Sequence, residues 1–188
     1  MSHYLQIPLG FIGLLSASLF LLGCGPSRPP LVTVPSVDLK RMEGTWYVIT
    51  HIPYWLEKGK VATADRYRLL PDGTMENIYV FRRGSFTAPE EEWHGVAWVH
   101  DQTTRAHWKV RFLWPFSLDY LIIDLDPEYR WLAVGHPSRN YFWILARERA
   151  IPAEIRAGII ARATQQGYDP SAFADVPQPV TDTTMSQP

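Results

Sequence analysis

The sequence contains almost no cysteine, since Cys24 is the single one among 188 residues. An intramolecular disulfide is therefore excluded, and the length allows one domain with its own packed core. Neither charge is in excess, because 18 lysines and arginines oppose 19 aspartates and glutamates, and no basic run occurs. Nucleic-acid binding requires a basic surface, so we expect no nucleic acid as a partner.

Patterns typical of catalytic and metal sites are missing as well. No serine lies in a nucleophile-elbow pattern, and the histidines after the leader show no metal-ligand spacing. These histidines are His51, His94, His100, His107 and His136. The sequence therefore predicts a protein that is not an enzyme and that has no catalytic residue, no metal and no cofactor.

Two acidic residues, Asp65 and Asp124, lie inside strand-like runs rather than in turns. We expect each of them to form an ordinary ion pair with an arginine rather than to perform chemistry. The candidate arginines are Arg66, Arg68 and Arg130.

A long uninterrupted hydrophobic run is also absent. Residues 5–23 are largely apolar, but Pro8 and several glycines and serines interrupt them, whereas a spanning helix needs about 20 apolar residues. The run ends in Leu21-Leu22-Gly23-Cys24, which resembles the lipobox of bacterial lipoprotein signal peptides. The alternatives are a plain secretory leader and a short membrane anchor.

The lipobox resemblance implies that residues 1–23 are a signal peptide and that Cys24 is lipidated, which anchors the protein to a membrane. Gly25 follows where an aspartate would otherwise stand, and in Gram-negative lipoproteins this implies the cell outer membrane, here on its periplasmic face. Residues 24–37 are rich in proline, and we expect them to form an extended tether that holds the domain some tens of Å from its anchor. Residues 177–188 are disordered by composition.

Between these ends, at residues 38–176, strand-like runs recur with good turn formers between them. The expected strands are 44–51, 62–70, 74–82, 92–100, 105–113, 118–125, 129–135 and 140–147. Short loops favour an all-β fold, an eight-stranded up-and-down antiparallel β-barrel whose interior accommodates one small ligand. A helix is expected at 152–167, with Ile155, Ile159 and Ala163 against the outside of the barrel.

The first and last strands predict how one end of the barrel closes. Trp46 begins an inward-facing alternation with Val48 and Thr50, and Gly44 leaves room beside the indole. If the sheet closes on itself, Arg147 at the end of the last strand can lie over Trp46 as a cation–π lid.

Aromatic residues are numerous, with eight tryptophans, nine tyrosines and eight phenylalanines, which indicates that some of them line a cavity. The alternation of each strand predicts its inward face. The predicted ligand-binding residues are Tyr67, Tyr79, Phe81, Trp108, Val110, Phe112, Tyr120, Ile122, Tyr141 and Trp143. On the fourth strand, Trp93 and Trp98 have opposite parity, and the sequence leaves open which of them faces inward.

The ordered set of Gly44-x-Trp46, Asp119-Tyr120 and the closing Arg147 before a helix resembles the lipocalins. With the lipobox, the chain is most similar to bacterial outer-membrane lipoprotein lipocalins, relatives of apolipoprotein D. The resemblance implies a calyx that binds fatty acids or lysophospholipids, for lipid transport, storage or scavenging at the envelope. It leaves open whether two copies form a homodimer.

Strand direction places four loops at the open mouth, and two of them carry Trp55, Trp114 and Phe116. These side chains form either an exposed rim or an inward-folded lid. Three other functions stay open: an envelope enzyme or isomerase on a lipid-like substrate, a structural lipoprotein with a filled barrel, and a haem carrier using His51 or His94.

Overall fold

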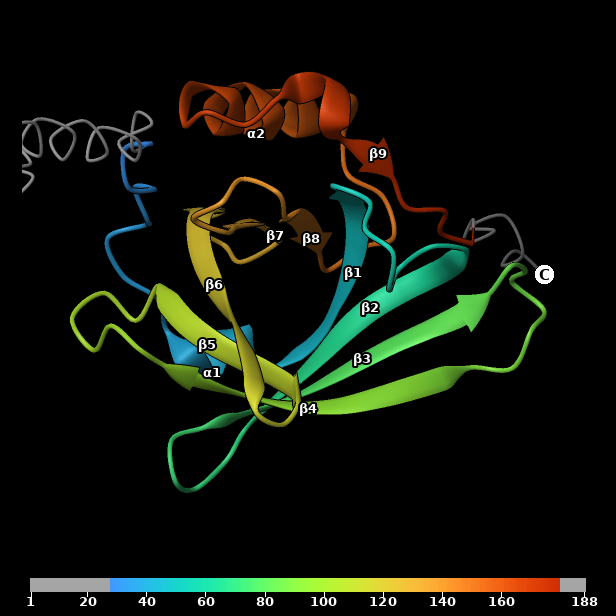
Figure 1. The fold of residues 1–188 in the computed structure, drawn as a ribbon, viewed down its shortest axis with the longest axis horizontal. Helices are drawn as coiled ribbons and strands as arrows, with labels where there is room; N and C mark the ends of the chain where they lie inside the picture. The colour runs from blue at the N-terminus through green and yellow to red at the C-terminus, as the bar shows by residue number, and fades with distance from the viewer. Residues whose placement is uncertain (1–27, 180–188) are drawn as a thin grey trace, which may run out of the picture.

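Eight antiparallel strands form a closed barrel in the computed structural model, which describes residues 28–179 (Figure 1). Each strand pairs with its sequence neighbours, and β1 pairs with both β2 and β8, which closes the sheet. The strands are β1 (Gly44–His51), β2 (Lys60–Leu69), β3 (Met75–Arg83), β4 (Glu91–Val99), β5 (His107–Leu113), β6 (Phe116–Leu125), β7 (Trp131–Gly135) and β8 (Phe142–Ala146). The predicted up-and-down barrel is confirmed, and closure removes the exposed sheet edges.

The remaining elements lie at one end or on the outside of the barrel. Helix α1 (Leu39–Met42) precedes β1, and α2 (Ala153–Gln165) follows β8 and lies along the outer wall, as Figure 1 shows. A 3-10 turn, η1 (Pro170–Ala172), leads into β9 (Ala174–Asp175), which pairs with β1. Within residues 28–179, the structure contains no helix of the length and apolarity needed to cross a membrane.

Alternation along the strands builds two separate cores. On β8, Trp143 and Leu145 face the barrel interior, as predicted, whereas Phe142 and Ile144 face outward and pack under α2. Ile159 and Ala163 of α2 complete this outer core. The apolar residues on both faces of β8 are therefore explained by burial on both sides.

The inward alternation expected for β1 ends before Thr50. The pairing of β1 with β8 shifts between Val48 and Thr50, and such a bulge turns the following side chains to the other face. The Thr50 hydroxyl consequently accepts a hydrogen bond from Arg156 Nε of α2 at 2.9 Å, outside the barrel.

The closed end has the geometry expected of Trp46 and Arg147. Arg147 Cζ lies 3.7 Å from the Trp46 ring centroid, and Trp46 Nε1 donates to the Met42 carbonyl of α1 at 2.7 Å. A Cβ on Gly44 would stand 3.2 Å from Arg147 Nη1, and Gly44 has a φ of +97°. Glycine therefore suits this position both by its space and by its backbone conformation.

The proline-rich segment differs from the expected free tether. Leu31 and Val37 are buried, and the backbone amides of Val34 and Val37 donate to Ile122 and Thr104 at 3.0 and 2.8 Å. Residues 28–37 therefore pack along the barrel, because their apolar side chains find unfilled surface there. Residues 1–23, Cys24 and Gly25 lie outside the described residues.

The C-terminal segment is also docked at its start. Ala62 N donates to the Pro177 carbonyl at 2.8 Å, and Gln178 Nε2 donates to the carbonyls of Val48 and Thr63. Pro177 and Gln178, the first residues of the expected disordered tail, therefore contact the barrel. Residues 180–188 lie outside the described residues.

Candidate functional site

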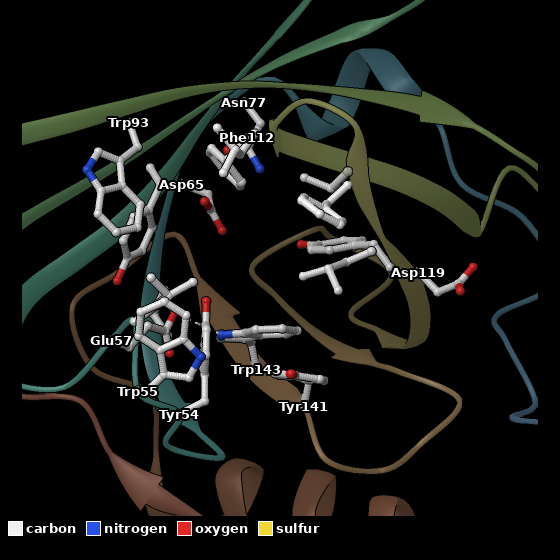
Figure 2. A pocket seen from close by; sticks show the side chains of 18 residues that line it. Tyr54, Trp55, Glu57, Asp65, Asn77, Trp93, Phe112, Asp119, Tyr141 and Trp143 are labelled. Carbon is white, nitrogen blue, oxygen red and sulfur yellow. Dashed lines mark hydrogen bonds between the residues drawn. The ribbon is translucent and has the colours of Figure 1, made fainter.

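A cavity of about 490 Å³ occupies the open half of the barrel (Figure 2). Its mouth lies at the end where loops join β1 to β2, β3 to β4, β5 to β6 and β7 to β8, opposite α1. The lining residues are Val48, Tyr54, Trp55, Leu56, Glu57, Asp65, Asn77, Tyr79, Trp93, Val110, Phe112, Leu113, Phe116, Leu118, Asp119, Tyr120, Tyr141 and Trp143. A cavity of this size and apolarity suits an apolar chain.

Most of the predicted ligand-binding residues line this cavity. They are Tyr79, Val110, Phe112, Tyr120, Tyr141 and Trp143. Tyr67, Trp108 and Ile122 also face inward but fill the closed half of the barrel, where they pack around Trp46. Phe81 is fully buried beside Trp93, with ring centroids 5.1 Å apart. Alternation therefore predicts the inward face, but it does not predict depth along the barrel.

The structure decides the parity of β4. Trp93 lines the cavity, whereas Trp98 lies outside the barrel with Arg111 Cζ 5.3 Å from its ring centroid. Gly95 shares the inward face, and a Cβ there would approach the Phe112 ring to 2.7 Å. The missing side chain at Gly95 makes room for Phe112 in the cavity wall.

One wall comes from the β1–β2 loop, which sequence alternation does not reach. Tyr54 packs edge-on against Tyr141 and Trp143, with ring centroids 5.3 and 6.3 Å apart, and Figure 2 shows the three rings together. Glu57 Oε1 accepts from Trp143 Nε1 at 3.2 Å, and Glu57 Oε2 lies 2.5 Å from His51 Nδ1. These contacts fix the buried Glu57 carboxylate beside the mouth.

The cavity floor is polar. Asp65 has Tyr67 as a hydrogen-bond donor at 3.3 Å, and the hydroxyls of Tyr67 and Tyr120 are 2.8 Å apart. Burial, followed by the charge of Glu57, raises the pKa of Asp65 to about 7. Asp65 shares its inward parity with Tyr67, and this signal in the sequence could have placed it in the cavity.

The expectation of an arginine partner for Asp65 is wrong. Arg66 bonds Glu90 and Glu92, Arg68 bonds Glu76 and Arg130 bonds Asp126, all outside the cavity. Asp124 does form an ion pair, but with Arg162 of α2 at 2.7 Å rather than with a residue of the sheet. The inward direction of Asp65 separates it from these arginines.

A buried lysine lies behind the aromatic wall. Lys60 Nζ is 3.3 Å from the Trp93 ring centroid and 3.8 Å from that of Phe81, and within residues 28–179 it has no hydrogen-bond partner. Burial lowers the pKa of Lys60 to about 8. Lys60 lines a second, outer cavity of about 450 Å³ together with His51 and Glu57, and it does not line the main one.

The mouth carries exposed aromatic side chains. Trp55, Trp114 and Phe116 are 80%, 78% and 72% exposed, so they form a rim rather than an inward lid. Leu113 lies beside them and is equally exposed. We call these four residues the apolar rim.

Of the five histidines, only His100 and His107 lie together among the described residues, with ring centroids 4.7 Å apart. His94 is exposed outside the barrel near Glu92, and His51 lies at the end of β1 against Glu57. Among the described residues, no three of His, Cys, Asp and Glu gather closely enough to hold a metal ion.

Known proteins are similar to this chain in sequence and in architecture. Residues 37–178 match the family described as the lipocalin-like domain. The chain is 35% identical over 176 residues to the outer membrane lipoprotein Blc of Escherichia coli K12, covering 91% of this chain and 97% of the relative. It is 31% identical over 160 residues to temperature-induced lipocalin-1 of Arabidopsis thaliana, with 80% and 84% covered.

Solved structures agree in fold. Insecticyanin from the tobacco hornworm Manduca sexta superposes with a TM-score of 0.63 at 15% identity, over 82% of this chain and 86% of its own. The sequence match over most of the chain and the closed eight-stranded barrel lead to one conclusion: the chain belongs to the lipocalin family.

Proposed function

We propose that this lipocalin binds one hydrophobic ligand, a fatty acid or a lysophospholipid, in the 490 Å³ cavity. The cavity itself is the observation that carries the proposal, since the barrel packs only its closed half and leaves the open half unfilled. Apolar walls from Val110, Phe112 and Leu118 suit an acyl chain. Trp143 and the tyrosines add aromatic contact area and hydrogen-bonding tips.

The same proposal includes the location. The relative from Escherichia coli is an outer membrane lipoprotein that this chain matches over nearly the whole of the relative's length. A lipobox ending at Cys24 supports anchoring of this chain in the outer membrane by acyl chains on that cysteine. The role is then lipid transport, storage or scavenging at the envelope, without enzymatic turnover.

Native mass spectrometry tests the proposal on the unlipidated chain from residue 25 onward, purified from a Gram-negative host. We expect one co-purified lipid per chain, displaced by added lysophospholipid or fatty acid with a change in tryptophan fluorescence. Replacement of the cavity-lining Trp143 by alanine removes about 1–2 kcal/mol of contact, so Kd rises about five- to thirtyfold.

The control is Trp98→Ala, which removes an indole from the outside of the same barrel and leaves Kd unchanged. An empty protein that binds neither ligand would contradict the proposal. It would favour a structural lipoprotein that binds partners.

A further inference from the structure

The cavity floor has acceptor atoms without matching hydrogens. Asn77 lies close enough to Asp65 to lower the pKa of that carboxyl, and among the described residues Asn77 Oδ1 has no hydrogen-bond partner, although Asn77 is only 2% exposed. A buried polar atom left without a partner costs about 1–3 kcal/mol. Both residues line the cavity, so a bound ligand can reach them.

The hydroxyls of Tyr67 and Tyr120, which bond Asp65 and each other, supply no spare hydrogen. Tyr67 donates to Asp65 Oδ2, so the hydrogen in the 2.8 Å contact with Tyr67 comes from Tyr120. Both phenolic hydrogens are thereby used. The oxygens of Asp65 and Asn77 keep lone pairs that can accept hydrogen bonds from a ligand.

The charge of Asp65 is not neutralised from inside the cavity. None of the described residues that line it is a lysine or an arginine. The other two carboxylates are already engaged, because Glu57 bonds His51 and Trp143, and Asp119 points away and pairs with Lys109 at 2.7 Å. Figure 2 shows Asp119 directed away from the cavity and Asp65 directed into it.

We propose that Asp65 and Asn77 form a subsite for a positively charged hydrogen-bond donor of the ligand, the primary ammonium group of a long-chain amine. The ammonium group offers three hydrogens and one positive charge to a floor of unpaired acceptors. The chain then extends past Phe112 and Trp143 toward the apolar rim. This inference rests on the proposed function, since it assumes that the cavity holds an amphiphile.

The subsite discriminates against anions of the same chain length. A carboxylate at the floor would bring a second negative charge to Asp65 and would leave Asn77 Oδ1 unpaired. Fatty acids therefore bind with the carboxylate nearer the mouth. The alcohol is intermediate, because its hydroxyl donates one hydrogen without charge.

The pH dependence has a definite sign. The groups facing Asp65 are Glu57, Asn77 and tyrosines whose pKa values are raised by burial, so these hydroxyls stay neutral between pH 6 and 8. Since the pKa of Asp65 is about 7, its ionised fraction increases about tenfold from pH 6 to 8, while a primary amine stays protonated. Affinity for the amine rises about tenfold over this range.

Titration of the full-length chain without its leader with decylamine, decan-1-ol and decanoate, followed by tryptophan fluorescence, tests the subsite. At pH 8 we expect the amine to bind at least tenfold more tightly than decanoate. Asp65→Asn abolishes this preference and the pH dependence, with little change for decan-1-ol. Asp124→Asn, which neutralises a carboxylate paired with Arg162 outside the cavity, retains both.

Asn77→Leu is the second variant, should Asp65→Asn not fold, and it lowers the preference for the amine about threefold or more. An amine preference that survives in folded Asp65→Asn, or that is undiminished in Asn77→Leu, would overturn the inference, as would equal binding of the amine and decanoate by the wild type. In those cases the cavity still binds an amphiphile and the proposed function stands. Binding of none of the three compounds would overturn both.

Discussion

Arg147 holds the closed end through several contacts of one side chain. Its guanidinium covers the Trp46 ring and donates to the carbonyls of Thr45 and Arg41 at 3.1 and 2.7 Å. The planar group can stack and donate in two directions at once. Arg147 therefore links the first strand, the last strand and the segment around α1.

Arg147→Ala removes the cation–π contact and leaves two carbonyls without these donors. We expect the free energy of unfolding to fall by about 2–3 kcal/mol, measured by urea denaturation. Arg147→Lys recovers only part of this loss, because an ammonium cannot lie flat on the indole while reaching both carbonyls. Unchanged stability of Arg147→Ala would contradict this account of the closed end.

Single residues differ in how far the sequence predicts their position and contacts. Trp46 and Arg147 are predictable because their partners are the ends of the strand series, which any closed meander brings together. Asp65 faces inward by alternation, yet its isolation from arginine depends on side-chain directions across three strands. Glu57 comes from a loop, where no period assigns a direction, and therefore only the structure places it at the cavity.

At the scale of elements, α2 packs on the barrel through one apolar stripe. Ile159 and Ala163 are buried against the outward face of β8, while Ala161 is exposed on the same helix. The period of the sequence predicts this stripe because helix geometry returns a side chain to the same face after about four residues.

Ile159→Ala leaves a cavity between α2 and β8, so we expect a loss of about 2–4 kcal/mol in the free energy of unfolding. Thermal denaturation followed by circular dichroism measures it, with Ala161→Ser as the control that changes stability by less than about 0.5 kcal/mol. A loss as small as that of the control would show that α2 packs only loosely on the barrel.

Strands and turns are predicted well, but the proline-rich segment is not. Its composition predicts an extended conformation without showing whether it touches the barrel. Leu31, Val34 and Val37 recur every third residue, the period of an extended polyproline-type chain, and they all pack against apolar clusters. This spacing is the signal that could have predicted docking.

For the molecule as a whole, the apolar rim departs from an ordinary polar surface. Trp55, Leu113, Trp114 and Phe116 gather at the mouth of the ligand cavity. Tryptophan is favoured at membrane–water interfaces, so we expect the rim to insert among lipid head groups.

Replacing Trp55 and Trp114 together by serine weakens binding of the unlipidated protein to phospholipid vesicles about tenfold, measured by co-sedimentation. The reason is the loss of two exposed indoles from the contact area. Val32→Ser, an exposed apolar position outside the rim, serves as the control. Equal vesicle binding of the double variant and the wild type would contradict a membrane role for the rim.

The docked N-terminal segment places the mouth of the barrel on the side from which the chain continues toward Cys24. Arg28 Nη1 donates to the Ser138 carbonyl and Arg139 Nη2 to that of Pro29, so the segment starts at the β7–β8 loop beside the mouth and reaches the closed end only at Val37. Cys24 precedes Arg28 by four positions, a span of at most about 14 Å. With acyl chains on Cys24, as proposed, the anchor and the apolar rim meet the same leaflet. We then expect the calyx to exchange ligand directly with that leaflet as a fixed port, rather than to shuttle across the periplasm as a carrier.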